Sequence, residues 1–192
     1  MRNTRITLMM FRTALLELDK KLISIDEHIT IKTIGGFALL YYGVRTVEYT
    51  ADIDTISVDY NQNVLKCIEE VANELNLPRD WINNYNVLDN DTETVELILD
   101  PFWNRAKWGL KNIELYIADL DTLLRSKLLA SEDDSQTNRL QDFPDLIGIL
   151  RKVGCFDLED CKKYVGYLDL DLERDFPSVY CRLKKHFGGM YK

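Results

Sequence analysis

The chain has 192 residues, of which 46% are hydrophobic, with a net charge of −8 and a pI near 4.9. This length supports one domain with a small second one, and the hydrophobic share is ordinary for a globular protein. The acidic balance argues against a broadly basic protein that binds nucleic acid without specificity, although it is compatible with a local basic groove.

The four cysteines contain no Cys-x-x-Cys pair, which disfavours a zinc site and favours free buried thiols in a reducing compartment. They are Cys67, Cys155, Cys161 and Cys181. Arg12 interrupts the early apolar run, so we expect no signal peptide, and no apolar stretch is long enough to span a bilayer. We therefore expect a soluble cytoplasmic protein with no membrane partner.

Two elements are expected before the first glycine pair. Residues 6–25 repeat apolar side chains at steps of three and four, which predicts an amphipathic helix packed on a sheet. Residues 30–34 form a short β-branched run, which predicts the first strand. The chain is thus expected to lead from a covering helix into a buried strand.

The stretch after this strand combines a glycine pair with an acidic pair. Gly35-Gly36 precedes an apolar helix expected over 37–42, and such a turn offers backbone N–H groups to a phosphate. Asp52 and Asp54 start another β-like run, so both point to one face, where Mg²⁺ suits two close carboxylates. The alternatives are a plain turn and a solvated strand start.

The order strand, Gly-Gly, short helix, Gly43-x-Arg45 and Thr-x-Asp-x-Asp resembles the nucleotidyltransferase superfamily that includes DNA polymerase beta. More narrowly, it is similar to the AbiEii-type toxin nucleotidyltransferases of bacteria. The resemblance implies that Gly35 and Gly36 hold the nucleoside triphosphate. It also implies that Asp52 and Asp54 bind a divalent metal, Mg²⁺ or Mn²⁺.

The next part of the chain is expected to supply a helix and a further strand. Residues 64–75 carry one apolar stripe, with Asn61 as the N-cap, and Trp81 is expected to anchor the following loop. Residues 94–99 alternate like a strand that Pro101 ends. The superfamily usually takes a third carboxylate from a neighbouring strand, and Glu96 and Asp100 are the two candidates by parity.

Residues 102–111 interleave aromatic and basic side chains. The cluster is Phe102, Trp103, Arg105, Lys107, Trp108 and Lys111. Such a mixture suits a surface that stacks single-stranded nucleic acid, but the acidic net charge favours a loop whose aromatic rings pack on the domain. A strand over 113–117 and a helix over 122–130 are expected to follow.

The resemblance continues at Ser-Lys127 and at Arg139-x-x-Asp142-x-x-Asp145. In the family this lysine contacts the substrate triphosphate with the first aspartate beside it, which assigns those roles to Lys127 and Asp142. Spacing alone indicates an ion network on a helix face. Pro144 requires a helix here to start close to it.

The remaining residues predict helices over 157–167 and 170–187. We expect an α/β fold in which a minimal nucleotidyltransferase core, a mixed sheet with flanking helices, is followed by a C-terminal helical bundle. The α/β domain is expected to cover residues 1–120 and the helical domain residues 121–192.

The resulting hypothesis is transfer of a nucleoside monophosphate from a nucleoside triphosphate to an acceptor hydroxyl. Lys127 would offset triphosphate charge, and Arg45 either helps or forms a salt bridge to a core acid. The family implies a toxin of a toxin–antitoxin system, with transfer RNA or another RNA as acceptor and a cognate antitoxin as partner. The alternatives are a catalytically inactive nucleotide-sensing or protein-binding module and a transferase that modifies a small molecule such as an aminoglycoside.

Overall fold

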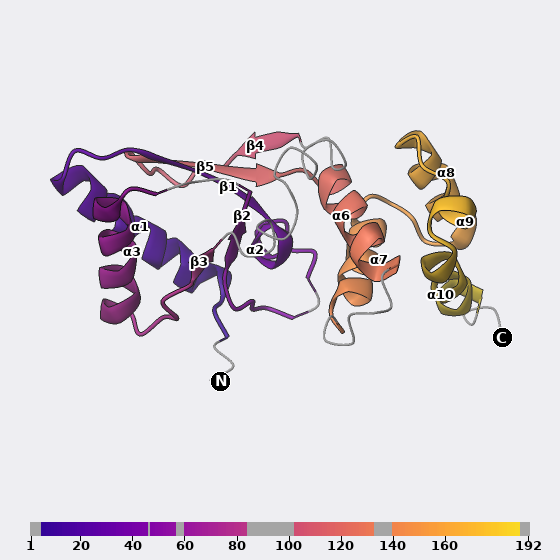
Figure 1. Cartoon of the computed structure of the whole chain (residues 1–192). Helices are drawn as coiled ribbons and strands as arrows, with labels where there is room; N and C mark the ends of the chain where they lie inside the picture. The colour runs from indigo at the N-terminus through magenta and orange to yellow at the C-terminus, as the bar shows by residue number, and fades with distance from the viewer. Residues whose placement is uncertain (1–4, 46, 57–59, 84–101, 133–139, 189–192) are drawn as a thin grey trace. The chain divides into compact units, whose positions relative to one another are not determined.

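The computed structural model describes residues 5–45, 47–56, 60–83, 102–132 and 140–188 (Figure 1). The chain forms two compact units. The first unit comprises Met1–Gly43 with Val47–Asp119, and the second comprises Val44–Thr46 with Leu120–Lys192. The boundary between sheet and helices therefore falls at residue 119, and a three-residue segment from the first half of the chain joins the second unit.

The first unit is built on a mixed sheet that has five strands among the described residues, in the order β3-β2-β1-β5-β4. The strands are β1 (Ile29–Ile34), β2 (Ile53–Thr55), β3 (Ile82–Asn83), β4 (Trp103–Arg105) and β5 (Ile113–Ala118). Strand β1 is parallel to β5 and antiparallel to β2, and β2 is parallel to β3. This sheet confirms the expected α/β class.

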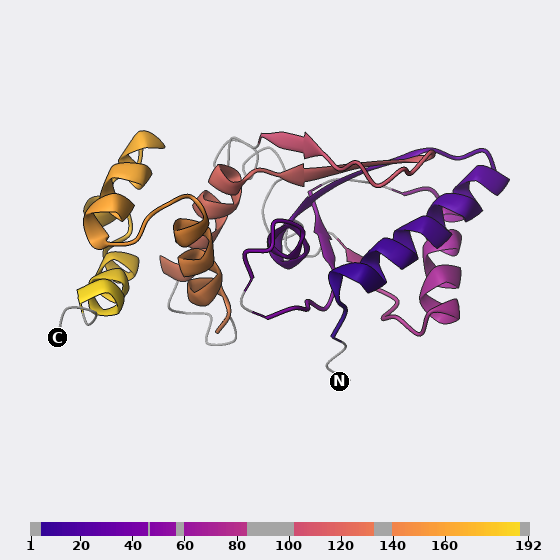
Figure 2. The same cartoon turned by 180° about the vertical axis from the view of Figure 1, so that it is seen from behind.

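Helices α1 (Leu8–Ser24) and α3 (Gln62–Glu74) cover the same side of the sheet (Figure 2). Both begin at a side-chain cap, because Thr7 accepts from the N–H of Met10 and Asn61 accepts from two N–H groups of α3. The predicted N-cap at Asn61 is confirmed. The apolar stripes of the two helices are buried and form the core below the sheet.

Helix α2 (Gly35–Tyr41) begins two residues earlier than predicted, directly after β1. Gly35 has φ +68°, a left-handed conformation that glycine adopts without steric cost. The glycine pair is therefore the first turn of the helix rather than a loop before it.

The second unit consists of helices in the part of the chain that is described. These are α6 (Leu120–Glu132), α7 (Asp142–Lys152), α8 (Leu158–Tyr167), α9 (Leu172–Asp175) and α10 (Pro177–Gly188). Pro144 lies in the first turn of α7, where proline needs no hydrogen-bond donor. The single helix predicted over 170–187 is wrong, because Phe176 is non-helical and Pro177 starts a new helix.

Three cysteines are buried as expected, but Cys181 is exposed on α10, which corrects the prediction that all four are buried. Burial raises the pKa of the Cys155 thiol to about 11 and that of Cys161 to about 12. The strand predicted over 94–99 lies outside the described residues. In the described chain, no helix combines the length and apolar character needed to cross a membrane.

Candidate functional site

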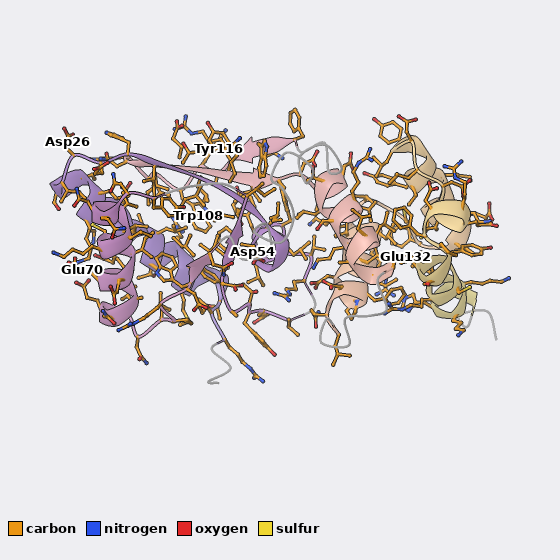
Figure 3. The ribbon with its side chains drawn as sticks, viewed as in Figure 1. Asp26, Asp54, Glu70, Trp108, Tyr116 and Glu132 are labelled. Carbon is orange, nitrogen blue, oxygen red and sulfur yellow. The ribbon has the colours of Figure 1, made fainter. Side chains whose placement is uncertain are left out.

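The glycine turn and the acidic pair meet at the end of β1. Ile34, the last residue of β1, is the register partner of Asp54 on β2. A Cβ added at Gly35 would fall on the carboxylate oxygen Oδ2 of Asp54, so this position leaves room for the carboxylate only as glycine. Figure 3 shows Asp54 on β2, beside α2. The expected proximity of acid and glycine turn is therefore present for Asp54.

The strand periodicity gives Asp52 and Asp54 a common face. Ile53 and Thr55 alternate with them and are buried, whereas both aspartates are half-buried. Because successive side chains of a strand point to opposite faces, the two carboxylates project from the same side of β2. The burial of residues 52–55 thus alternates as the predicted parity of the acidic pair requires.

Asn83 is a third polar residue of this site, and the sequence reasoning missed it. Its amide Nδ2 donates to Asp52 Oδ2 at 2.8 Å and to the Asp80 carbonyl at 3.2 Å. Strand β3 brings Asn83 there because it pairs with Asp54 in the β2–β3 register. The signal in the sequence was the segment Trp81-Ile-Asn83, which is similar to a Trp-Leu-Asn-type segment of the AbiEii-like family but to which the sequence reasoning assigned no role in the site.

Trp81 is that anchor, as predicted. Its ring is fully buried, and its Nε1 donates to the carbonyl of Ile68 on α3 at 3.2 Å. A buried indole with its N–H satisfied fixes the chain just before β3. The anchor therefore holds the strand that carries Asn83.

The oxygen donors of this site suit a hard divalent cation. Mg²⁺ prefers carboxylates, keeps several waters and completes its shell with substrate phosphates, so one or two protein carboxylates suffice. Asp52 and Asp54 supply two carboxylates, and the lack of a Cβ at Gly35 leaves room for that of Asp54. In the described chain, no group of three or more metal-binding side chains occurs. Glu96 and Asp100, the candidate third ligands, lie outside the described residues.

Lys127 belongs to a buried group of four charges in the second unit. Its Nζ lies 2.5 Å from Asp142 Oδ1 and 3.8 Å from Asp145 Oδ2. Arg45 Nε lies 3.4 Å from Asp145 Oδ1. Asp145 is fully buried, and this burial raises the pKa of its carboxyl above the usual range against the attraction of Arg45 and Lys127.

This group contains the core salt bridge that was the alternative expectation for Arg45. Among the described residues, the ion network indicated by the spacing of Asp142 and Asp145 includes both aspartates and Lys127. Arg139, the other residue of that prediction, lies outside the described residues. Gly35, Gly36 and the acidic pair belong to the other unit. The contact of Lys127 with a triphosphate stays a prediction.

The aromatic and basic cluster of residues 102–111 divides between two environments. Trp108 packs edge-on against Phe37 of α2, with ring centroids 5.9 Å apart. Trp103 lies in β4 with Lys32 Nζ 5.6 Å from its ring, and Arg105 pairs with Glu114 at 3.0 Å. Trp108 agrees with the favoured expectation that the aromatic rings pack on the domain, whereas Phe102 is exposed and departs from it.

Comparison of the chain with protein-family models, with curated protein sequences and with solved structures found no match.

Proposed function

We propose that this protein is a metal-dependent nucleotidyltransferase. The observation that carries the proposal is the close approach of the glycine turn and Asp54, in which Gly35 leaves space for the Asp54 carboxylate. A bare backbone turn next to two carboxylates joins a place for phosphate oxygens to a place for a cation. Transfer of a phosphoryl-linked group needs both, because catalysis of that reaction is largely positioning and charge stabilisation.

In this proposal Asp52 and Asp54 would hold Mg²⁺ or Mn²⁺. When bound, the ion would neutralise negative charge on the phosphate groups. Gly35 and Gly36 present backbone N–H groups to the triphosphate, since Ile34 provides no side-chain cap for the start of α2. The acceptor is a hydroxyl group, and the products are the nucleotidylated acceptor and pyrophosphate.

The roles proposed for residues of the second unit come from the resemblance to the nucleotidyltransferase family. Lys127 would offset triphosphate charge, with Asp142 holding its ammonium group by the 2.5 Å ion pair. Arg45 has the same candidate role, although its pairing with Asp145 supports a structural one. The RNA acceptor, transfer RNA in particular, and an antitoxin partner are likewise proposals from the resemblance.

The test is label transfer. The full chain is incubated with each labelled nucleoside triphosphate, Mg²⁺ and total RNA, and the RNA is then examined for label. We expect wild type to transfer label and Asp54→Asn, which keeps the shape but removes the charge, to lose transfer by at least about a hundredfold, or roughly 2.7 kcal/mol. Glu69→Gln, an exposed carboxylate on α3, is the matched control and should be unaffected.

Other outcomes separate the alternatives. Nucleotide binding without metal and without transfer would support an inactive sensing or protein-binding module. Transfer to small acceptors such as aminoglycosides, but not to RNA, would support the small-molecule transferase. Equal transfer by wild type and Asp54→Asn would contradict the assignment of this site.

A further inference from the structure

The amide nitrogen of Asn83 makes two hydrogen bonds at this site. Nδ2 donates to Asp52 Oδ2 at 2.8 Å and to the Asp80 carbonyl at 3.2 Å. Turning the amide over would bring its oxygen against two acceptor oxygens, so this pair of contacts fixes the orientation of the side chain. Asn83 is itself held in register beside Asp54 by the β2–β3 pairing.

A neutral hydrogen-bond donor such as an amide can orient a carboxylate while leaving its negative charge available to a cation. Two carboxylates on one strand face repel each other, which favours rotation of one of them away from the other. An amide hydrogen bond opposes that rotation without cancelling the negative charge. Asp142 shows the contrast in the same chain, because its partner is the ammonium group of Lys127.

We propose that Asn83 is a positioning residue that holds the Asp52 carboxylate in the orientation needed for the divalent metal. The inference rests on the proposed function in taking Asp52 as a metal ligand. Asn83 acts through Asp52 and not on the substrate. Hydrogen-bonding partners of metal ligands typically change metal affinity by about 10- to 100-fold when they are removed.

The experiment measures Mn²⁺ binding to the full chain without nucleotide, by loss of the electron paramagnetic resonance signal of free Mn²⁺. We expect Asn83→Ala to raise the apparent Kd for Mn²⁺ by about tenfold or more. The thermal midpoint without metal is recorded for each variant to establish that it is folded.

Thr55→Val is the matched control for a purely structural role. The Thr55 hydroxyl donates to the backbone carbonyl of Asn83 at 3.0 Å, so this variant weakens the tether between β2 and β3 but leaves the amide contact with Asp52. We expect Thr55→Val to lower the thermal midpoint and to change the Mn²⁺ affinity by less than about threefold, below the range seen when a ligand's own partner is lost.

The outcomes distinguish the two proposals. If Asp54→Ala weakens Mn²⁺ binding but Asn83→Ala does not, the metal site stands and the role of Asn83 is overturned. Equal weakening by Asn83→Ala and Thr55→Val also overturns it, since strand pairing would then be the cause. If wild type binds Mn²⁺ no better than Asp54→Ala, the metal site of the proposed function fails, and this inference fails with it.

Discussion

Gly35 is the residue whose replacement tests the site most directly. Its φ of +68° is strained for any residue with a Cβ, and the added Cβ would also meet the Asp54 carboxylate. Gly43 has a similar φ of +63°, but no atom of the described residues lies within 4 Å of where its Cβ would stand. The two glycines therefore separate the cost of the backbone conformation from the cost of displacing the carboxylate.

We predict that Gly35→Ala abolishes label transfer, whereas Gly43→Ala retains it. Both variants carry the left-handed backbone penalty of roughly 1–2 kcal/mol, which chemical unfolding should reveal. Only Gly35→Ala also moves Asp54. Equal transfer by the two variants would remove the glycine contact as the basis of the site.

The alternation of side chains predicts one face for Asp52, just before β2, and Asp54, within it. This prediction needs only the sequence, because alternation is a property of the strand itself. The contact of Asp52 with Asn83 had no such local signature. The two residues are 31 positions apart, and only the pairing of β2 with β3 brings them together.

At the scale of elements, Asp19 joins helix α1 to the start of β5. Its buried carboxylate accepts hydrogen bonds from the backbone N–H groups of Lys111, Asn112 and Ile113, at distances from 2.7 to 3.1 Å. Without Asp19, these three N–H groups would lose this acceptor. The hydrogen bonds therefore explain why an acidic residue, Asp19, lies on the buried face of α1.

We predict that Asp19→Ala lowers the free energy of unfolding by about 3 kcal/mol, because several hydrogen bonds to a charged acceptor are lost and the donors stay in place. Glu17, on the same helix, pairs with Lys20 at the surface, so Glu17→Ala should change the free energy of unfolding by less than about 0.5 kcal/mol. Urea unfolding measures both. Similar losses for the two variants would show that the Asp19 contacts contribute little.

The starts and ends of the helices depend on capping residues and prolines. The cap at Asn61 and the early proline of α7 follow from the sequence, since caps and proline act within one turn. The helix predicted over 6–25 instead begins after its cap at Thr7, which the apolar repeat did not indicate. At Phe176-Pro177 two local signals conflict, because the apolar repeat continues through the proline. The proline decides the outcome, since one helix ends before Phe176 and the next begins at Pro177.

At the scale of the whole molecule, the second unit is completed by the segment Val44–Thr46. Gly148 of α7 lies so close to Val44 that an added Cβ would stand 2.6 Å from the Val44 carbonyl oxygen. The next residue, Arg45, pairs with buried Asp145. A short stretch that follows α2 is therefore bound into the helical unit by packing and by charge.

We predict that Lys127→Met destabilises the protein by about 3 kcal/mol at pH 7, because it leaves Asp142 and Asp145 as neighbouring buried carboxylates with less compensation. Burial raises the pKa of the Asp145 carboxyl above its ordinary range, and loss of the nearby Lys127 ammonium raises it further. A raised carboxyl pKa means that the folded state binds the proton more tightly. The stability this provides is full below the unfolded pKa and lost as the pH rises through the folded one.

The loss in Lys127→Met should therefore be smaller near pH 4 than at pH 7. Chemical unfolding at the two pH values measures the difference, with Lys163→Met, an exposed lysine on α8, as the control. A loss independent of pH would indicate that the packing of the lysine stem, and not its charge, is what matters.

The sequence by itself determined the features that depend on neighbours along the chain: the alternation that predicts one face for the acidic pair, the glycine pair next to the start of α2, the cap at Asn61, and the α/β class. Only the tertiary structure decided which distant polar groups meet, as Asp52 with Asn83, Asp19 with Asn112, and Arg45 with Asp145. The physical reason is one of range. Periodicity and capping act over a few residues, whereas a buried polar group takes the partner that strand pairing and helix packing bring to it.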